Sequence, residues 1–212
     1  MIYILSTRKE EINKTLRDFK DSFYLSDNLD FVSQIDPKKK NFLIAHNTNL
    51  IVPSDVLSIF DACFNIHAAS PDFPGRDPHH WAIYYNATNY GATLHKMEEK
   101  VDAGQIILYK SFNCCKEDTP LTLLNRANAI SMDIMRFAII ELIENLSISN
   151  IFGTWVWGKK KKTRKDLLAI TDCSNDSEEE IINKIKAFSH PKHANLYIKK
   201  GEYTFYLLNE KK

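Results

Sequence analysis

An asparagine and a histidine stand two positions apart at the end of a short apolar run, and an aspartate follows in a later segment. These residues are Asn65, His67 and Asp102. Side chains two positions apart in a strand point to the same face, so Asn65 and His67 are expected to emerge together. An amide N–H can stabilise an oxyanion, an imidazole can accept a proton, and a carboxylate can orient that imidazole and raise its basicity. Such groups suit acyl transfer to an amine of the substrate, although by residue type alone a structural role for His67 is the more common outcome.

Strands that alternate with helices are expected to position these groups. Apolar runs of strand length cover residues 1–6, 23–25, 41–46 and 62–66, and helical patterns follow residue 6 and Pro53. This alternation predicts an α/β fold, with a parallel-rich sheet flanked by helices. Ligands of such sheets bind at the carboxyl ends of the strands, where Asn65 and His67 would lie.

The second half of the chain is expected to add two strands, a long helix and a small terminal unit. Strands are predicted over residues 91–97 and 105–112, on either side of the loop that carries Asp102. Thr119 is the expected N-cap of the longest helix, and Ser177 with Glu180 forms a capping box for a helix over 178–188. Residues 196–199 and 203–208 predict a β-hairpin. We therefore expect a catalytic core over residues 1–150 and a C-terminal extension over 151–212.

The motifs around the three polar groups resemble those of the folate-dependent formyltransferases. Asn65-x-His67 is followed by a loop rich in proline and glycine, then by GATLHKM at 91–97 and DAGQI at 102–106. The resemblance is strong over about residues 41–110 and continues weakly to the end of the chain. It implies a Rossmann-like formyltransferase core and transfer of a formyl group from N10-formyltetrahydrofolate, with Asn65, His67 and Asp102 at the family's catalytic positions.

The same resemblance implies where the two substrates bind. The folate pocket of the family is built largely from backbone, in the loop after strand 41–46 and in the loop that carries the aspartate. The implied folate-binding residues are Ala45, His46, Asn47, Leu50, Val52, Val101 and Gly104.

Residues near the mouth of the sheet are candidates for binding the acceptor. They are Arg8, Ser70, Arg76, Asp77 and His79. Arg76 could contact a phosphate, and Asp77 or His79 a sugar hydroxyl. The alternative for Asp77 is that it caps a helix that begins at Pro78, and the alternative for Arg8 is a solvated charge.

Composition bears on the choice of acceptor. The chain has 28 Lys and Arg against 27 Asp and Glu, a formal net charge of +1, which argues against a nucleic-acid partner such as tRNA. The aromatic hairpin looks like the short C-terminal part of sugar N-formyltransferases, where it commonly supports a homodimer; packing within its own unit is the alternative. We expect the acceptor to be a nucleotide-linked amino sugar, in particular a dTDP-4-amino-4,6-dideoxyhexose destined for a surface polysaccharide such as lipopolysaccharide O-antigen.

Three alternatives stay open at this stage. The acceptor could be glycinamide ribonucleotide or another small amine. The chain could be a folate- or nucleotide-binding module without activity, or mainly an assembly partner. A lysine run at residues 159–162 and the neighbouring Trp155 and Trp157 fit a solvated surface and core packing, or contacts with a pyrophosphate and a nucleobase.

Other site classes are not indicated. The four cysteines show no C-x-x-C spacing, and the histidines near Asp102 match no zinc pattern, so no metal is expected. The apolar stretch over residues 134–143 contains Arg136 and Glu141 and is too short to span a membrane. With 44% hydrophobic and 26% charged residues, the composition is that of a folded protein, which we expect in the cytoplasm.

Overall fold

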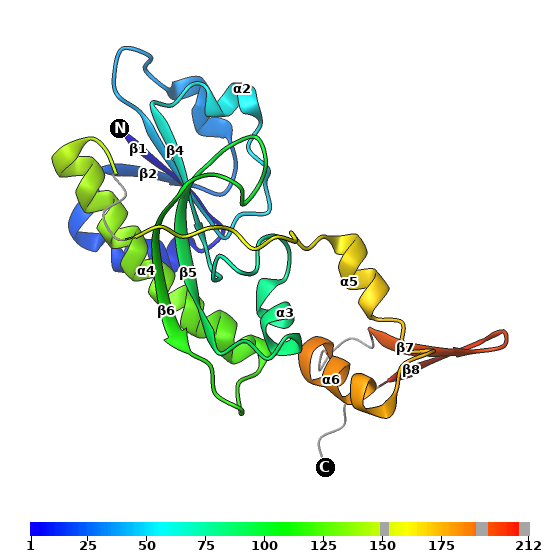
Figure 1. Cartoon of the computed structure of the whole chain (residues 1–212). Coiled ribbons are helices and arrows are strands. Elements are labelled where there is room, and N and C mark those ends of the chain that lie inside the picture. The colour runs from blue at the N-terminus through cyan, green and yellow to red at the C-terminus, as the bar shows by residue number, and fades with distance from the viewer. Residues whose placement is uncertain (149–152, 190–194, 208–212) are drawn as a thin grey trace.

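A six-stranded sheet forms the centre of the computed structural model, which describes residues 1–148, 153–189 and 195–207 (Figure 1). Its strand order is β2-β1-β3-β4-β5-β6. The strands are β1 (Ile2–Leu5), β2 (Phe23–Ser26), β3 (Phe42–His46), β4 (Ala62–His67), β5 (Asn89–Lys96) and β6 (Ile106–Asn113). Strands β1 to β4 are parallel, whereas β5 and β6 are each antiparallel to the preceding strand. The expected α/β fold with a parallel-rich sheet is confirmed.

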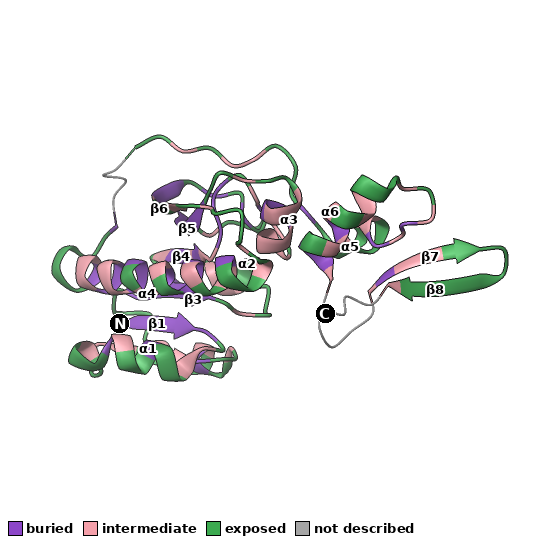
Figure 2. Ribbon diagram, turned by 90° about the horizontal axis from the view of Figure 1, so that it is seen from below, coloured by how far each residue is buried: buried purple, intermediate pink, exposed green. Residues whose placement is uncertain are grey.

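Helices cover both faces of the sheet. The helices of the described residues are α1 (Lys9–Thr15), α2 (Ser54–Leu57), α3 (Pro78–Tyr84), α4 (Pro120–Asn145), α5 (Arg164–Ile170) and α6 (Glu178–Phe188), with two 3₁₀ turns at Arg17–Phe19 and Asp30–Gln34; α5 and α6 belong to the C-terminal part and do not cover the sheet. On one face α1 and α4 bury Ile12 and Ile134 against Ile4 and Ile44. On the other face the second 3₁₀ turn and the segment around α2 pack against Tyr3 and its neighbours. Figure 2 shows that the buried residues concentrate in the strands and along α4.

The expected helix caps are found in two of three places. Thr119 accepts a hydrogen bond from the Thr122 N–H, and the Thr122 hydroxyl accepts one from the Thr119 N–H, which completes a capping box at the start of α4. Ser177 accepts from the Glu180 N–H at the start of α6, but the Glu180 carboxylate accepts from the Tyr84 hydroxyl, so the expected capping box is only half formed. At α3, however, Asp77 has a φ of 54° and makes no capping bond, so its side chain is not used by the helix.

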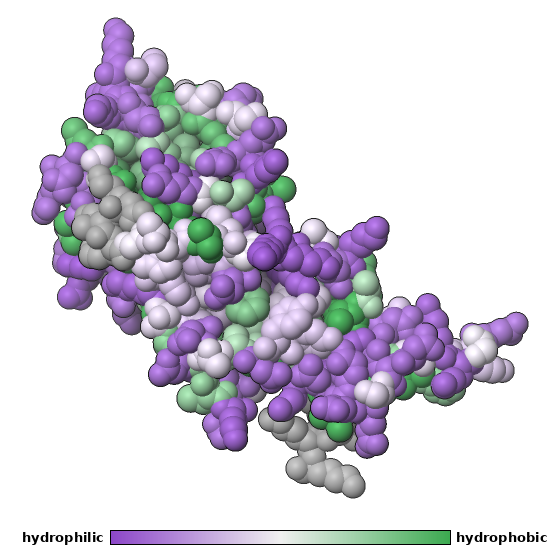
Figure 3. All heavy atoms as spheres, in the orientation of Figure 1, coloured by the Kyte–Doolittle hydropathy of each residue, from purple (hydrophilic) through white to green (hydrophobic). Residues whose placement is uncertain are grey.

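The C-terminal residues form a small unit beside α3. Strands β7 (Leu196–Lys200) and β8 (Tyr203–Leu207) make an antiparallel hairpin with its own two-stranded sheet, which projects away from the central sheet (Figures 1 and 2). The predicted hairpin is confirmed apart from residue 208, which lies outside the described residues. Phe188 of α6 packs on Trp81 of α3, which joins the unit to the core. On the face drawn in Figure 3, hydrophilic side chains cover most of this unit. The boundary at residue 150 lies outside the described residues, so that division stays a prediction.

Candidate active site

The carboxyl end of β4 brings Asn65 beside His95 of β5. The two residues are directly opposite each other in the sheet, and Asn65 Nδ2 lies 3.0 Å from His95 Nε2. His95 Nδ1 lies 2.8 Å from the carbonyl oxygen of Lys96, which can only accept, so Nδ1 carries the proton. In the neutral ring Nε2 then accepts one N–H of Asn65. This bond fixes the amide and leaves its second N–H for a ligand in the cleft that Asn65 lines.

His67 ends β4 and is held by backbone. Its Nε2 lies 3.2 Å from the carbonyl oxygen of Phe73, so Nε2–H donates to that oxygen. Its Nδ1 is then free of a proton in the neutral ring and lies 3.7 Å from Asp102 Oδ1. The Phe73 carbonyl therefore orients the ring, while Asp102 is placed to stabilise the charge that forms when Nδ1 accepts a proton.

Asp102 sits on the loop between β5 and β6 with a φ of 50°, in the left-handed region. Its Oδ2 accepts a hydrogen bond of 2.9 Å from the Gly75 N–H, and its Oδ1 lies 3.5 Å from His95 Nε2. Burial raises the pKa of Asp102, but the positive charge that His67 and His95 carry when protonated, together with the Gly75 N–H, outweighs burial and holds this pKa below its usual range. The carboxylate thus stays charged at neutral pH.

These groups open onto a cleft of about 360 Å³ at the end of the sheet. Asn65, His67, His95 and Asp102 all line it. Its walls are the loop after β3 and the loop that carries Asp102, which are the two loops expected to bind folate. A volume in this range is typical of a cleft for a small organic ligand.

Five of the seven folate-binding candidates line the cleft, namely Ala45, Asn47, Leu50, Val52 and Val101. His46 and Gly104 do not. His46 is fully buried, and neither ring nitrogen has a hydrogen-bond partner among the described residues. Alternation along β3 turns its side chain into the core, whereas the neighbouring Ala45 and Asn47 reach the cleft. Gly104 instead accepts a hydrogen bond from Trp157 through its carbonyl oxygen.

Of the acceptor-binding candidates, Asp77 and His79 line the cleft. Burial and then the charge of His80 lower the pKa of His79 to about 3, so His79 is neutral there. The other three candidates are not among the residues that line the cleft. Arg8 is paired with Glu11, Ser70 is fully buried, and Arg76 Nε lies 3.4 Å from Asp77.

Two residues of the site were noticed in the sequence but not assigned to the catalytic groups. His95 lies within the GATLHKM motif, and the strand predicted there could have placed it opposite Asn65. Trp157 lies 55 positions beyond Asp102 in an irregular segment, and no spacing rule connects the two.

Comparison with known families matches residues 8–139 of the chain to the formyl transferase family. The match contains β3 to β6 and with them all four polar groups of the cleft. The chain belongs to the formyl transferase family. The catalytic positions inferred from the motifs thus fall inside the family's own segment, although their roles stay predictions.

Two curated relatives of this formyl transferase have different functions. The chain is 25% identical over 170 residues to the bifunctional polymyxin resistance protein ArnA of Wigglesworthia glossinidia brevipalpis, with 77% of the chain and 25% of the relative covered. It is 34% identical over 99 residues to a methionyl-tRNA formyltransferase of Ehrlichia ruminantium, with 46% and 32% covered. The chain therefore spans a quarter to a third of the length of these relatives.

Two solved structures match this chain along almost their whole length. A sugar N-formyltransferase from a Shewanella species has a TM-score of 0.74 at 20% identity, with 100% of this chain and 97% of that chain covered. An N-formyltransferase from Helicobacter canadensis, solved with folinic acid and dTDP-3-aminofucose, has a TM-score of 0.65 at 18% identity, with 96% and 93% covered. These likenesses establish the Rossmann-like formyltransferase fold, including the C-terminal hairpin.

Two absences hold for residues 1–148, 153–189 and 195–207, which are the residues that the structure describes. Within them no group of three or more His, Cys, Asp or Glu side chains is arranged to hold a metal ion. Among the same residues no helix combines the length and the apolar character that crossing a bilayer requires.

Gly75 places the N–H that bonds Asp102, and its replacement by alanine is expected to be costly. Its φ is 98°, and an added Cβ would lie 2.2 Å from the carbonyl oxygen of Lys162. Strain and overlap together should lower the free energy of unfolding by about 2–4 kcal/mol. Gly201→Ala is the matched control, because Gly201 also has a positive φ, of 60°, but faces open space. It should cost about 1 kcal/mol. Equal losses in urea denaturation of the two variants would contradict the close approach at Gly75.

Proposed function

We propose that this protein transfers a formyl group from N10-formyltetrahydrofolate to the amine of a nucleotide-linked amino sugar. The observation that carries the proposal is the convergence of Asn65, His67 and Asp102 on one cleft, in a member of the formyl transferase family. The loops around the cleft offer apolar side chains for a flat ring at Leu50, Ile51, Val52 and Val101, beside polar residues of the same loops. We propose that His79 and Asp77 face the acceptor. His79 is neutral in the cleft, and the side chain of Asp77 makes no capping bond to α3.

The proposed reaction uses each polar group once. The free amine attacks the formyl carbon, a C–N bond forms, and the second N–H of Asn65 stabilises the resulting oxyanion. The attacking nitrogen passes its proton to His67 Nδ1, and the imidazolium is stabilised by the carboxylate of Asp102 at 3.7 Å. When the intermediate collapses, the bond to N10 breaks, N10 takes up the proton held by His67 Nδ1, and tetrahydrofolate leaves with His67 neutral again.

A sugar acceptor is favoured over the alternatives by two observations. One solved structure of similar extent is a sugar N-formyltransferase, and another, an N-formyltransferase, was solved with a dTDP-linked amino sugar. The net charge of +1 gives little attraction for tRNA, the acceptor of a curated relative that this chain covers only in part. Within the sugars, a dTDP-4-amino-4,6-dideoxyhexose for a surface polysaccharide is our specific proposal.

One assay separates the proposed acceptor from its rivals. The purified protein is incubated with N10-formyltetrahydrofolate and, in parallel, with a dTDP-linked 4-amino sugar, glycinamide ribonucleotide or charged methionyl-tRNA. Release of tetrahydrofolate and a product heavier by one formyl group are expected only with the sugar. Transfer to another of these amines would show that it, and not the sugar, is the acceptor. Folate binding without any transfer would show that the protein is a binding module.

We also propose that the hairpin supports a homodimer. Tyr203, Phe205 and Tyr206 of β8 are exposed to 72%, 57% and 59%, which is unusual for aromatic side chains that pack within their own unit. Sedimentation of the protein should give twice the monomer mass of 24.5 kDa. Replacing Phe205 by Ser should return it to a monomer, and a monomeric unmodified protein would refute the dimer.

A further inference from the structure

A segment outside the family match crosses the candidate active site. Residues 157–162, here called the strap, run between α4 and α5 and are drawn in yellow in Figure 1. The Gly158 N–H donates to the Pro71 carbonyl at 2.9 Å, and the Lys162 N–H donates to the Pro74 carbonyl at 3.0 Å. The Arg76 N–H donates back to the Lys162 carbonyl at 2.9 Å. The strap is therefore docked along the loop that follows His67.

The far end of the strap is anchored on α3. The ammonium of Lys162 lies 3.9 Å from the centroid of the Trp81 ring and donates to the Tyr85 hydroxyl at 2.8 Å. Lys162 is only 9% exposed. A buried cation held by an aromatic face and a hydrogen bond fixes the backbone that carries it. This accounts for one lysine of the run without a ligand.

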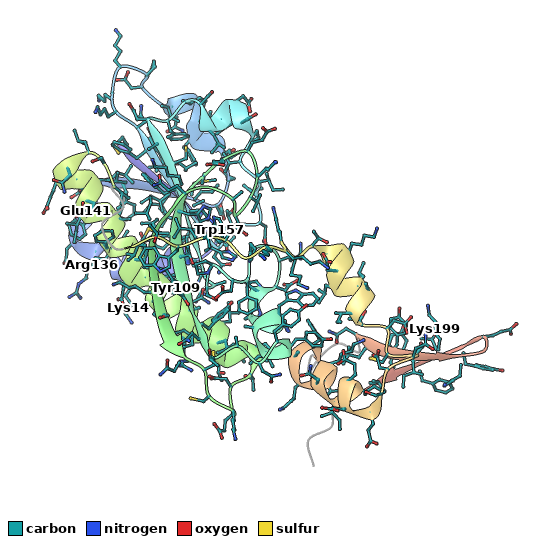
Figure 4. The ribbon with its side chains drawn as sticks, in the orientation of Figure 1. Lys14, Tyr109, Arg136, Glu141, Trp157 and Lys199 are labelled. Carbon is teal, nitrogen blue, oxygen red and sulfur yellow. The ribbon has the colours of Figure 1, made fainter. Side chains whose placement is uncertain are left out.

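The near end of the strap reaches the polar groups of the cleft. Trp157 Nε1–H donates to the carbonyl oxygen of Gly104 at 2.7 Å. The Trp157 ring lies 4.9 Å from the His95 ring at an interplanar angle of 90°, and 6.0 Å from the His67 ring at 67°. In Figure 4 it lies at the centre of the molecule, far from the hairpin residue Lys199. One side chain thus contacts both imidazoles and the Asp102 loop.

The loop that carries Asp102 has a backbone conformation that its surroundings must stabilise. Asp102 has a positive φ, which a non-glycine residue keeps only where its surroundings hold it. The strap supplies two of the holding bonds, since Lys161 Nζ also donates to the Val101 carbonyl at 2.9 Å. The two bonds flank Asp102 in sequence, at Val101 and Gly104.

We propose that Trp157 is a positioning residue for formyl transfer, which fixes the Asp102 loop through Gly104 and aligns the rings of His67 and His95. The inference rests on the proposed function and extends it to the C-terminal unit. Trp157 lies outside residues 8–139, which match the family. The strap that leads to the small C-terminal unit thus adds a residue to the catalytic site.

The test replaces Trp157 by Phe, which keeps an aromatic ring and removes the N–H donor. We expect kcat to fall about tenfold with the KM for the amine nearly unchanged, because the catalytic groups and not the acceptor contacts are displaced. The ring-proton NMR titrations of His67 and His95 should also shift. Trp155→Phe is the matched control: Trp155 contacts Tyr109, with ring centroids 6.4 Å apart, and should leave kcat and both titrations unchanged.

A second variant covers the case in which Trp157→Phe does not fold. Lys161→Met removes the bond to Val101 at an exposed position and should lower kcat in the same direction, about two- to threefold. Unchanged kcat and unchanged titrations in the variants that fold would overturn the positioning role. If the unmodified protein transfers no formyl group, the proposed function fails, while the titrations still decide whether Trp157 sets the histidine environment.

Discussion

Replacing His67 by asparagine is expected to lower kcat for formyl transfer by about 10²–10⁴-fold. In the structure Nδ1 of His67 is the unprotonated nitrogen, because Nε2–H donates to the Phe73 carbonyl at 3.2 Å. Nδ1 also lies 3.7 Å from Asp102, so the proton it gains meets a carboxylate that is charged at neutral pH. Asparagine can still donate a hydrogen bond but cannot accept the proton. The loss is measured as the rate of tetrahydrofolate release at saturating substrates.

Two controls assign that loss to proton transfer. Binding of folinic acid, followed by fluorescence, should change less than threefold, because the cleft loops are untouched. Added imidazole should restore part of the rate in His67→Asn but none in Asn65→Asp, where an oxyanion donor is missing and the expected loss is about 10²–10³-fold. Wild-type turnover in His67→Asn would remove His67 from the mechanism and return it to a structural role.

The local elements of this fold could be predicted because short-range chemistry determines them. The capping threonine of α4 lies at Thr119, and the hairpin occupies the expected strands, because a cap depends on a side chain three residues away and a tight turn on its own residues. The antiparallel pairing of β6 with β5 could also have been predicted. A parallel pair needs a crossover of about a dozen residues or more, and only residues 97–105 separate these strands.

The site could be predicted only in part, because some of its residues belong to sequence motifs and others only to loops whose backbone forms the pocket. Asn65, His67 and Asp102 belong to motifs that can be seen in the sequence. Asn47 and Val101 lie in the two loops that the family resemblance assigns to folate binding, and both line the cleft. Where the backbone of a loop forms the pocket, however, the sequence shows which residues belong to the loop but not where each side chain points. His46 was for this reason assigned to the folate pocket although the pleat of β3 turns it inward.

The inward side chain of His46 is expected to make the stability of the protein depend on pH. Burial, and then the charge of Arg8, lowers the pKa of His46 from 6.5 to about 4, while Glu11 acts in the opposite direction. Between these values the unfolded chain binds a proton that the folded protein does not, so stability falls as the pH decreases from 6.5 and the loss is complete near pH 4. The difference in pKa corresponds to about 3 kcal/mol in the free energy of unfolding.

This contribution is isolated by comparing variants across the same pH range. His46→Leu removes the titrating group and two buried nitrogens without hydrogen-bond partners among the described residues, so its stability should fall by about 3 kcal/mol less than that of the unmodified protein between pH 7 and pH 4. Ile44→Val is the control on the same buried strand and should cost about 1 kcal/mol at every pH. Urea denaturation at four pH values measures both. If the difference between His46→Leu and the unmodified protein does not change with pH, His46 is either protonated in the folded state or exposed to water, and its place in the core is wrong.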